Sequence, residues 1–421
     1  MTTTIGHPAL RGRTVPRSFT HRFAVPGVST TRFWILASIV TVLNMVGTLM
    51  VISSSSVASA ELTGGASPWL FAKRQLMFTG IGMIALVVML FVSVRFWRRV
   101  AYPLFLVSLL PLVAVAVPGL GSSKNGAARW LDIGPIQFQP SELVKLTLLL
   151  AVADVLARRE RRLDDWRESL VPVLIPLVVV CGLIMAQPNL GTTIIIAVTI
   201  MTMVWVAGVR MKPLAAVGGI GALFAAGFVV LEPFRLRRFL SFLDPRGDLD
   251  GAGYQTGQAM IGFANGGLIG RGLGRSTVKW GYLPYAFNDF IFAVVGEELG
   301  LAGAMFVVVA FLAFILVGTS IAMSSDDPDR DRFPLLVAVG VTAWLGVQAI
   351  MNMAVVTGAM PLTGVPLPFI SFGGSAQIVN LAAVGLLLNV ARHPAAAPSK
   401  PLGRRLHSVG GTGTARRKGS S

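Results

Sequence analysis

Long apolar segments recur along this sequence, separated by polar breaks, and they set its expected architecture. A helix needs about 20 residues to cross roughly 30 Å of hydrocarbon. About ten apolar segments approach or exceed that length, near residues 33–56, 75–94, 100–118, 141–157, 170–186, 190–208, 213–231, 287–322, 334–356 and 371–391. The pattern predicts an all-α, polytopic integral membrane protein with about ten transmembrane helices and a large extracytoplasmic loop before the eighth.

The polar connections fall into two sets that differ in length and charge. Arginine and lysine residues gather at 11–32, 95–99, 158–167 and 404–418. Positively charged loops tend to stay in the cytoplasm, so both chain termini are predicted to be cytoplasmic. The other set contains the long connections, which are expected outside the membrane: 119–140, 232–286 and 357–370.

Composition narrows the class of protein and divides the chain. Of the 421 residues, 54% are hydrophobic and 13% are charged, with a mean hydropathy of +0.71; a soluble domain has about 25% charged residues. The net charge of +17 comes from loops and tails without a reading motif, so no nucleic-acid partner is expected. Residues 33–392 form the predicted membrane domain. The basic tails, 1–32 and 393–421, are predicted to be disordered, and either contact membrane lipids or only fix the topology.

Two opposite charges lie inside the fourth predicted helix. Glu142 and Lys145 are three residues apart, so they share one helix face and can neutralise each other. Ionisable groups inside a membrane are costly, which makes each of them a candidate functional residue. One interpretation is a structural ion pair, and the other is a charged floor beneath a substrate cavity.

Three carboxylates mark the eighth predicted helix. Asp289 lies at its outer end, and Glu297 and Glu298 follow. On one continuous helix, Glu297 would lie about 80° around and roughly 12 Å deeper than Asp289, as its inward companion. A carboxylate at a water-accessible mouth between phenylalanines can have a raised pKa and remove a proton from a sugar hydroxyl. The alternative role of Asp289 is to cap the helix start.

The long outer loop is more basic than an extracytoplasmic loop usually is. Its cations include Arg235, Arg238, Arg271 and Lys279. Guanidinium and ammonium groups suit phosphates, so a lipid-linked phosphate or pyrophosphate is the expected ligand. Contact with anionic lipid headgroups is the alternative.

Two further outer segments are too rich in glycine or proline for regular helices. The glycines of 266–274 match no nucleotide-binding spacing and are expected in a turn packed closely against helices. Segment 361–375, which contains Ser371 and Ser375, is broken repeatedly by proline and glycine. Irregular backbone at membrane depth is tolerated where it lines a cavity, so this segment is expected beside Asp289.

Several short motifs, in order along the chain, resemble the FtsW/RodA family, also called the shape, elongation, division and sporulation family. They are Arg129-Trp130-Leu131, Gln139 to Lys145, Gln187-Pro188, Arg235 to Pro245, Gly253-Tyr254-Gln255, Leu283-Pro284 and Asp289-Phe290-Ile291-Phe292. The resemblance runs from about Phe33 to Arg392. Lys279 and the segment 296–300 resemble the division branch of the family more than the elongation branch.

The resemblance implies a peptidoglycan glycosyltransferase that polymerises lipid II at the outer face of the bacterial cytoplasmic membrane, during septal wall synthesis. Asp289 matches the family's essential acid, and would be the general base of an inverting transfer from a polyprenyl-pyrophosphate-linked glycan. The expected substrate-binding residues are Arg129, Glu142, Lys145, Arg235, Arg238, Gln255, Lys279, Glu297, Ser371 and Ser375. The expected partners are a class B penicillin-binding transpeptidase and other divisome proteins. No protein metal site is expected, although Mg²⁺ or Mn²⁺ could accompany the pyrophosphate.

Other functions stay open from the residues alone. An elongation polymerase is the nearest alternative, and a transporter of lipid-linked precursors would also use broken helices and charges inside a bundle. The special residues gather at the outer mouth, which favours the enzyme. A scaffold without activity is a third alternative, because the family has His where this chain has Phe287.

Overall fold

The chain folds into a bundle of long helices with one small sheet. The computed structural model describes residues 31–117, 119–124, 127–134, 136–162, 165–243, 252–281, 283, 286–325 and 331–392. The α-helices of this part are α1 (Thr31–Leu62), α2 (Leu70–Phe91), α3 (Val94–Ala116), α4 (Pro140–Arg158), α5 (Trp166–Ala186), α6 (Leu190–Ala207), α7 (Met211–Leu231), α8 (Pro233–Leu243), α9 (Ala252–Gly266), α10 (Ile291–Ser324), α11 (Phe333–Val356) and α12 (Ser375–Arg392). Strands β1 (Ser122–Lys124), β2 (Ala127–Ile133) and β3 (Ile136–Phe138) form an antiparallel sheet in that order.

The predicted transmembrane segments all coincide with long helices. Within the described residues, nine helices are long and apolar enough to cross a membrane. The one predicted segment outside this set is the fourth, α4, which is less apolar because it carries four charged residues, Glu142, Lys145, Asp154 and Arg158. Most of α4 is buried by the other helices, so it need not present an apolar surface to lipid. The prediction of an all-α, polytopic membrane protein is confirmed.

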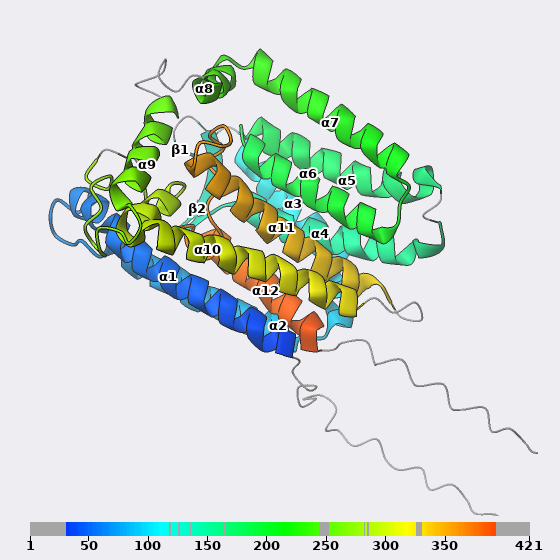
Figure 1. Cartoon of the computed structure of the whole chain (residues 1–421). Helices are drawn as coiled ribbons and strands as arrows, with labels where there is room; N and C mark the ends of the chain where they lie inside the picture. Colours follow the sequence, from blue (N-terminus) through cyan, green and yellow to red (C-terminus); the bar gives the residue numbers. More distant parts are fainter. Residues whose placement is uncertain are drawn as a thin grey trace, which may run out of the picture.

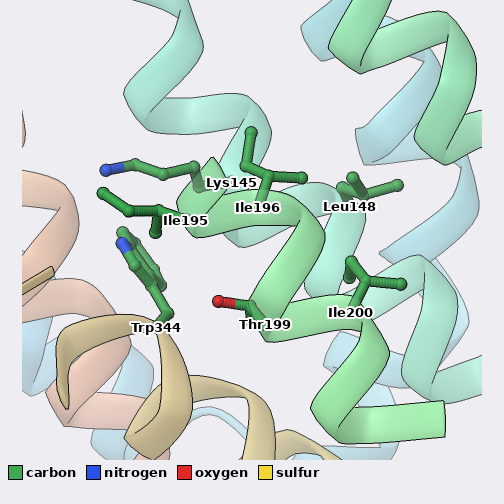
Figure 2. A pocket seen from close by; sticks show the side chains of 7 residues that line it. All are labelled: Lys145, Leu148, Ile195, Ile196, Thr199, Ile200 and Trp344. Carbon is green, nitrogen blue, oxygen red and sulfur yellow. The ribbon is translucent and has the colours of Figure 1, made fainter. Parts of the chain in front are cut away.

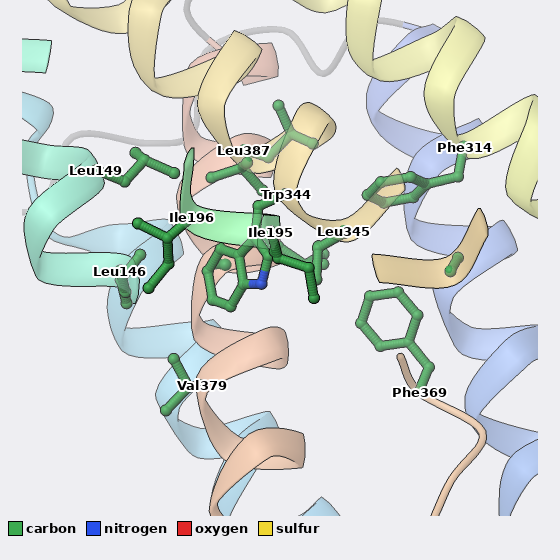
Figure 3. Packing of buried hydrophobic residues seen from close by; sticks show 14 of the residues in the cluster. Leu146, Leu149, Ile195, Ile196, Phe314, Trp344, Leu345, Phe369, Val379 and Leu387 are labelled. Atoms are coloured by element: carbon green, nitrogen blue, oxygen red, sulfur yellow. The ribbon is translucent and has the colours of Figure 1, made fainter. Parts of the chain in front are cut away.

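The apolar core lies where α4, α6, α11 and α12 meet. Figure 3 shows Leu146 and Leu149 of α4 near Ile196 of α6 and Trp344 of α11. Trp344 is 1% exposed and is among the largest fully buried side chains. Helix α11 packs against α4, α6, α10 and α12. These central helices provide a rigid support for the connections at their ends.

Helix α7 has little contact with the rest of the bundle. Figure 1 shows it along one side, with α8 at one of its ends. Leu214 is its one buried residue, whereas Leu223 and Phe224 are 74% and 77% exposed. Exposed apolar surface of this kind is stable only in lipid or under a partner. The side chains of α7 therefore face outward along almost its whole length.

Helix α10 is interrupted at Gly300, where φ is +70°. A glycine takes this backbone conformation without strain, and the break leaves amide and carbonyl groups without helical partners. The turn at 266–274 supplies them, because the amide of Leu301 donates to Gly267 O (2.9 Å) and the amide of Arg271 donates to Glu297 O (3.0 Å). A Cβ on Gly270 would lie 2.2 Å from the carbonyl oxygen of Glu298. The predicted close packing of this glycine-rich turn against helices is confirmed.

The connections separate into two opposite ends of the bundle. Figure 1 shows the start of α1 and the end of α12 at one end, and β1, α8 and α9 at the other. At the first end, Arg98 contacts both Asp154 (Nε–Oδ1 2.8 Å) and Asp331, and Arg332 pairs with Glu160 (Nε–Oε1 2.9 Å). At the second end, the predicted outer loops contain the sheet β1–β3 and the helices α8 and α9, which the hydropathy pattern missed because they are short. The predicted tails, except Thr31 and Arg32, lie outside the described residues.

Candidate functional site

Asp289 lies in a turn directly before α10 and is partly buried. The charges that act on it are those of Arg129, from β2, and Arg238, from α8. Burial raises the pKa of Asp289 to about 6, against the lowering effect of the two guanidinium groups. We call these three residues the Asp289 cluster. A carboxyl with a pKa near neutral, under the charge of two guanidinium groups, is suited to general base catalysis on an anionic substrate.

Arg129 is held by the connection between α5 and α6. Its Nε donates to the carbonyl oxygen of Gln187 (3.1 Å), and its Nη2 donates to that of Pro188. Gln187 is held in turn, since its Nε2 donates to Leu112 O (3.0 Å). The Arg-Trp-Leu and Gln-Pro motifs, 58 residues apart, therefore meet at the site. The carbonyl groups of the Gln-Pro motif hold the guanidinium of Arg129 in place.

The segment 361–375 borders the Asp289 cluster, as predicted. Gly364 has φ +69°, and a Cβ built on it would lie 3.4 Å from Asp289 Oδ2. The two serines predicted to bind substrate fasten this segment: Leu367 N donates to Ser371 Oγ (2.8 Å), and Gln139 N donates to Ser375 Oγ (3.1 Å). The irregular backbone is thus fixed by its own side chains, and substrate contact by either serine stays a prediction.

Some of the buried polar atoms without a hydrogen-bond partner in the described structure belong to this segment or to residues of the outer loop, of α11 and next to Asp289. They include Arg235 Nη1, Asn288 Oδ1, Asn352 Oδ1 and Thr363 Oγ1. Unsatisfied polar atoms in a buried place are costly unless water or a ligand completes them. Their positions, on the outer loop, beside Asp289 and in the 361–375 segment, favour a site that receives a polar substrate.

Glu142 and Lys145 form the buried ion pair that their spacing predicts. Their Nζ and Oε2 atoms are 2.9 Å apart, and both side chains are 3% exposed. Lys145 Nζ also donates to Gln348 Oε1 (3.0 Å) and lies 4.9 Å from the centre of the Trp344 ring. Figure 2 shows Lys145 above Trp344 in a narrow pocket that Thr199 also lines. The predicted ion pair is confirmed, while a role beneath the substrate stays a prediction.

Glu297 and Lys279 are engaged with the outer loop itself. Glu297 accepts hydrogen bonds from Ser276 Oγ (2.5 Å) and Thr277 N (3.0 Å), and Lys279 Nζ lies 3.6 Å from Glu298 Oε1. The helical geometry that made Glu297 the inward companion of Asp289 is wrong, because α10 begins at Ile291 and Asp289 precedes it. Glu297 and Lys279 both hold the outer loop against α10. Substrate contact by either residue stays a prediction.

The remaining predicted residues lie on the outer helices. Gln255 is half-buried in α9, and Arg235 in α8 places its guanidinium 3.8 Å from the centre of the Phe228 ring.

The helix-capping alternative for Asp289 is wrong, since the N-cap of α10 is Phe290 and no side chain caps it. The sequence interpretation missed Asn352, whose signal was a polar residue within an apolar helix.

Comparisons with known proteins identify relatives of this chain. A family of cell cycle proteins that comprises FtsW, RodA and SpoVE matches residues 33–396. A probable peptidoglycan glycosyltransferase FtsW of Mycobacterium tuberculosis is 38% identical over 363 residues, which cover 86% of this chain and 68% of the relative. The stage V sporulation protein E of Bacillus subtilis is 37% identical over 359 residues, covering 85% and 97%.

Solved structures give the same result. A chain of a peptidoglycan synthase complex, solved to explain how polymerization and crosslinking are coordinated, has a TM-score of 0.70 at 29% identity, covering 87% of this chain and 98% of that one. The rod shape determining protein RodA of Thermus thermophilus has a TM-score of 0.62 at 28% identity, covering 87% and 97%. The family match, residues 33–396, includes all three residues of the Asp289 cluster.

Proposed function

Because this chain belongs to the FtsW, RodA and SpoVE family of cell cycle proteins, we infer that it is a peptidoglycan glycosyltransferase with Asp289 as its general base. Its relatives are named for that activity. The observation that carries the residue assignment is the Asp289 cluster, a partly buried carboxyl whose pKa is raised to about 6 between two arginines.

The reaction requires a proton acceptor and a stabilised leaving group. The Asp289 carboxylate takes the proton of the acceptor sugar's 4-hydroxyl, and that oxygen attacks the anomeric carbon of the polyprenyl-pyrophosphate-linked glycan. The bond to the pyrophosphate breaks with inversion, and the leaving oxygen keeps the electron pair. Arg129 and Arg238 stabilise the charge on the pyrophosphate, as fixed cations do in transition states. Asp289 then returns its proton to water.

The acid limb of the pH profile tests the base directly. Asp289 acts only when ionised, so polymerisation of labelled lipid II by the purified protein should fall tenfold per pH unit below about pH 6. Glycan strands resolved by electrophoresis at pH 4.5–8 would give the midpoint. A rate that stays flat down to pH 4.5, as the ordinary aspartate pKa of 3.8 would give, would contradict the assignment, and lipid II transport without polymer would favour the transporter.

Partner and location are extensions of this proposal. The solved complex is a peptidoglycan synthase in which polymerization and crosslinking are coordinated, which supports a crosslinking transpeptidase of the class B penicillin-binding type as partner at the septum. In the described part of the chain, no group of three His, Cys, Asp or Glu side chains could hold a metal ion. Any Mg²⁺ or Mn²⁺ would therefore be bound mainly by the pyrophosphate.

The orientation in the membrane follows from the basic connections at one end. With Cys181 replaced by serine, a cysteine at exposed Asn265 should react with an impermeant thiol reagent in intact cells, and a cysteine at exposed Arg162 should not. Arg162 should be protected because positively charged loops tend to stay on the cytoplasmic side of the membrane. Labelling of Arg162→Cys only after lysis is the control, and its labelling in intact cells would reverse the orientation.

A further inference from the structure

Asn352 connects the backbone of Asp289 to the segment that borders its carboxylate. The residue lies in α11 and is 1% exposed. Its Nδ2 donates to the carbonyl oxygen of Asp289 (2.7 Å) and to that of Val365 (2.8 Å). Both N–H groups of one amide are used, so a single rigid side chain fixes the distance between two separate segments.

The two segments need such a connection. Asp289 lies before α10 and not within it, so helical hydrogen bonds do not set the position of its carbonyl. Val365 directly follows Gly364, where a Cβ would lie 3.4 Å from Asp289 Oδ2. The Asn352 amide therefore controls both the base and the backbone beside it.

Gln348, one turn earlier on the same face of α11, fixes the next carbonyl of the segment. Its Nε2 donates to Pro366 O (3.0 Å), while its Oε1 accepts from Lys145 Nζ and Trp344 Nε1, each at 3.0 Å. Consecutive carbonyls of the irregular segment are thus attached to consecutive turns of a buried helix. Rigid support of this kind keeps a reacting group within the narrow range that catalysis tolerates.

We propose that Asn352 is a positioning residue, which holds the Asp289 carboxylate at the distance and angle that proton removal requires. The proposal rests on Asp289 being the general base. A displacement of about 1 Å at a reacting group can lower a rate by about 10²-fold. Loss of the Asn352 amide should therefore lower kcat more than it changes substrate binding.

Asn389 offers a matched control. It is also 1% exposed, and its Nδ2 also donates to two carbonyl oxygens, those of Met89 (2.8 Å) and Val92 (2.6 Å). These carbonyls belong to the last turn of α2, beside the end of α12, and Figure 1 shows the end of α12 at the opposite end of the bundle from α8 and β1. Asn389→Leu therefore removes the same kind of bond without touching the base.

The test measures lipid II polymerisation by folded, purified Asn352→Leu and Asn389→Leu. Asn352→Leu should lower kcat by about 10²-fold, with KM for lipid II within about threefold. Its acid limb should also move below pH 6, because a loosened Asp289 gains water. Asn389→Leu should keep both kcat and the limb. Asn352→Ala, which adds no bulk, serves if the leucine variant fails to fold, and Asn352→Gln, which keeps the donors, should restore activity in part.

A normal kcat and an unmoved acid limb in folded Asn352→Leu or Asn352→Ala would overturn the proposal. Equal losses of kcat in the Asn352 and Asn389 variants would overturn it too, since both would then act through general stability. The assignment of Asp289 fails separately, when Asp289→Asn keeps its activity. If Asp289→Asn were inactive and Asn352→Leu were fully active, Asp289 would remain the general base, and only the positioning role of Asn352 would be excluded.

Discussion

Replacing Asp289 by asparagine is expected to lower glycan polymerisation by about 10²–10⁴-fold, the usual contribution of a positioned acid or base. The amide has nearly the same size as the carboxyl and can still accept a hydrogen bond, but it does not take up a proton at neutral pH. The backbone carbonyl that binds Asn352 is unchanged. The loss should therefore appear in kcat with labelled lipid II, while the protein stays inserted, folded and bound to its partner.

Asp132 provides the control for this substitution. It lies in β2, the same strand as Arg129, and is exposed, with its Oδ1 accepting from Gln137 Nε2 (3.0 Å). Asp132→Asn makes the same chemical change on the same side of the bundle and should leave polymerisation within about twofold, as is usual for surface substitutions. Near-normal synthesis by Asp289→Asn would exclude Asp289 as the base and return the transporter and scaffold alternatives.

The largest expected effect on stability comes from breaking the Glu142–Lys145 pair. Glu142→Ala or Lys145→Ala leaves the other charge buried without its partner, which typically costs about 3–5 kcal/mol. The double change to Leu and Met removes both charges, and Gln348 Oε1 keeps its bond from Trp344. The double variant should therefore be close to the wild type in its free energy of unfolding, and either single variant should be far below it.

An exposed ion pair calibrates that measurement. Arg162 and Glu168 are 2.9 Å apart, with side chains 70% and 46% exposed. Arg162→Ala should change stability by no more than about 1 kcal/mol, because water already screens the pair. Thermal unfolding in a fixed detergent would compare these four variants with the wild type. If the single variants at Glu142 and Lys145 were as stable as the double variant, the pair would have no stabilising role.

Predictions from the sequence were accurate where the signal was local. Each apolar run became a helix, because the length that hydrocarbon requires and the hydrogen bonds that it enforces depend only on neighbouring residues. The Glu142–Lys145 pair followed from a three-residue spacing, which fixes a shared helix face. The irregular segment 361–375 followed from the positions of its prolines and glycines.

What only the tertiary structure decided depends on residues far apart in the chain. Hydropathy predicted one long eighth helix, yet the break at Gly300 exists because the turn after α9 replaces the missing hydrogen bonds. Asp289 also lies outside α10, and Glu297 accepts hydrogen bonds from Ser276 and Thr277, so the position relative to Asp289 that a continuous helix predicted for Glu297 is wrong. Periodicity along one helix carries no information about a loop that binds it.

The site itself was identified in part by sequence and assembled only by folding. The sequence selected Asp289 as a carboxylate at an outer mouth, and the resemblance gave it a role. The raised pKa comes from burial by other elements, against the lowering charges of Arg129 and Arg238, and the fixed position of Asp289 needs Asn352, 63 residues further along. A polar residue in an apolar helix predicts that its side chain has a hydrogen-bond partner. Which backbone it holds is decided by the packing of α11 against the rest of the bundle.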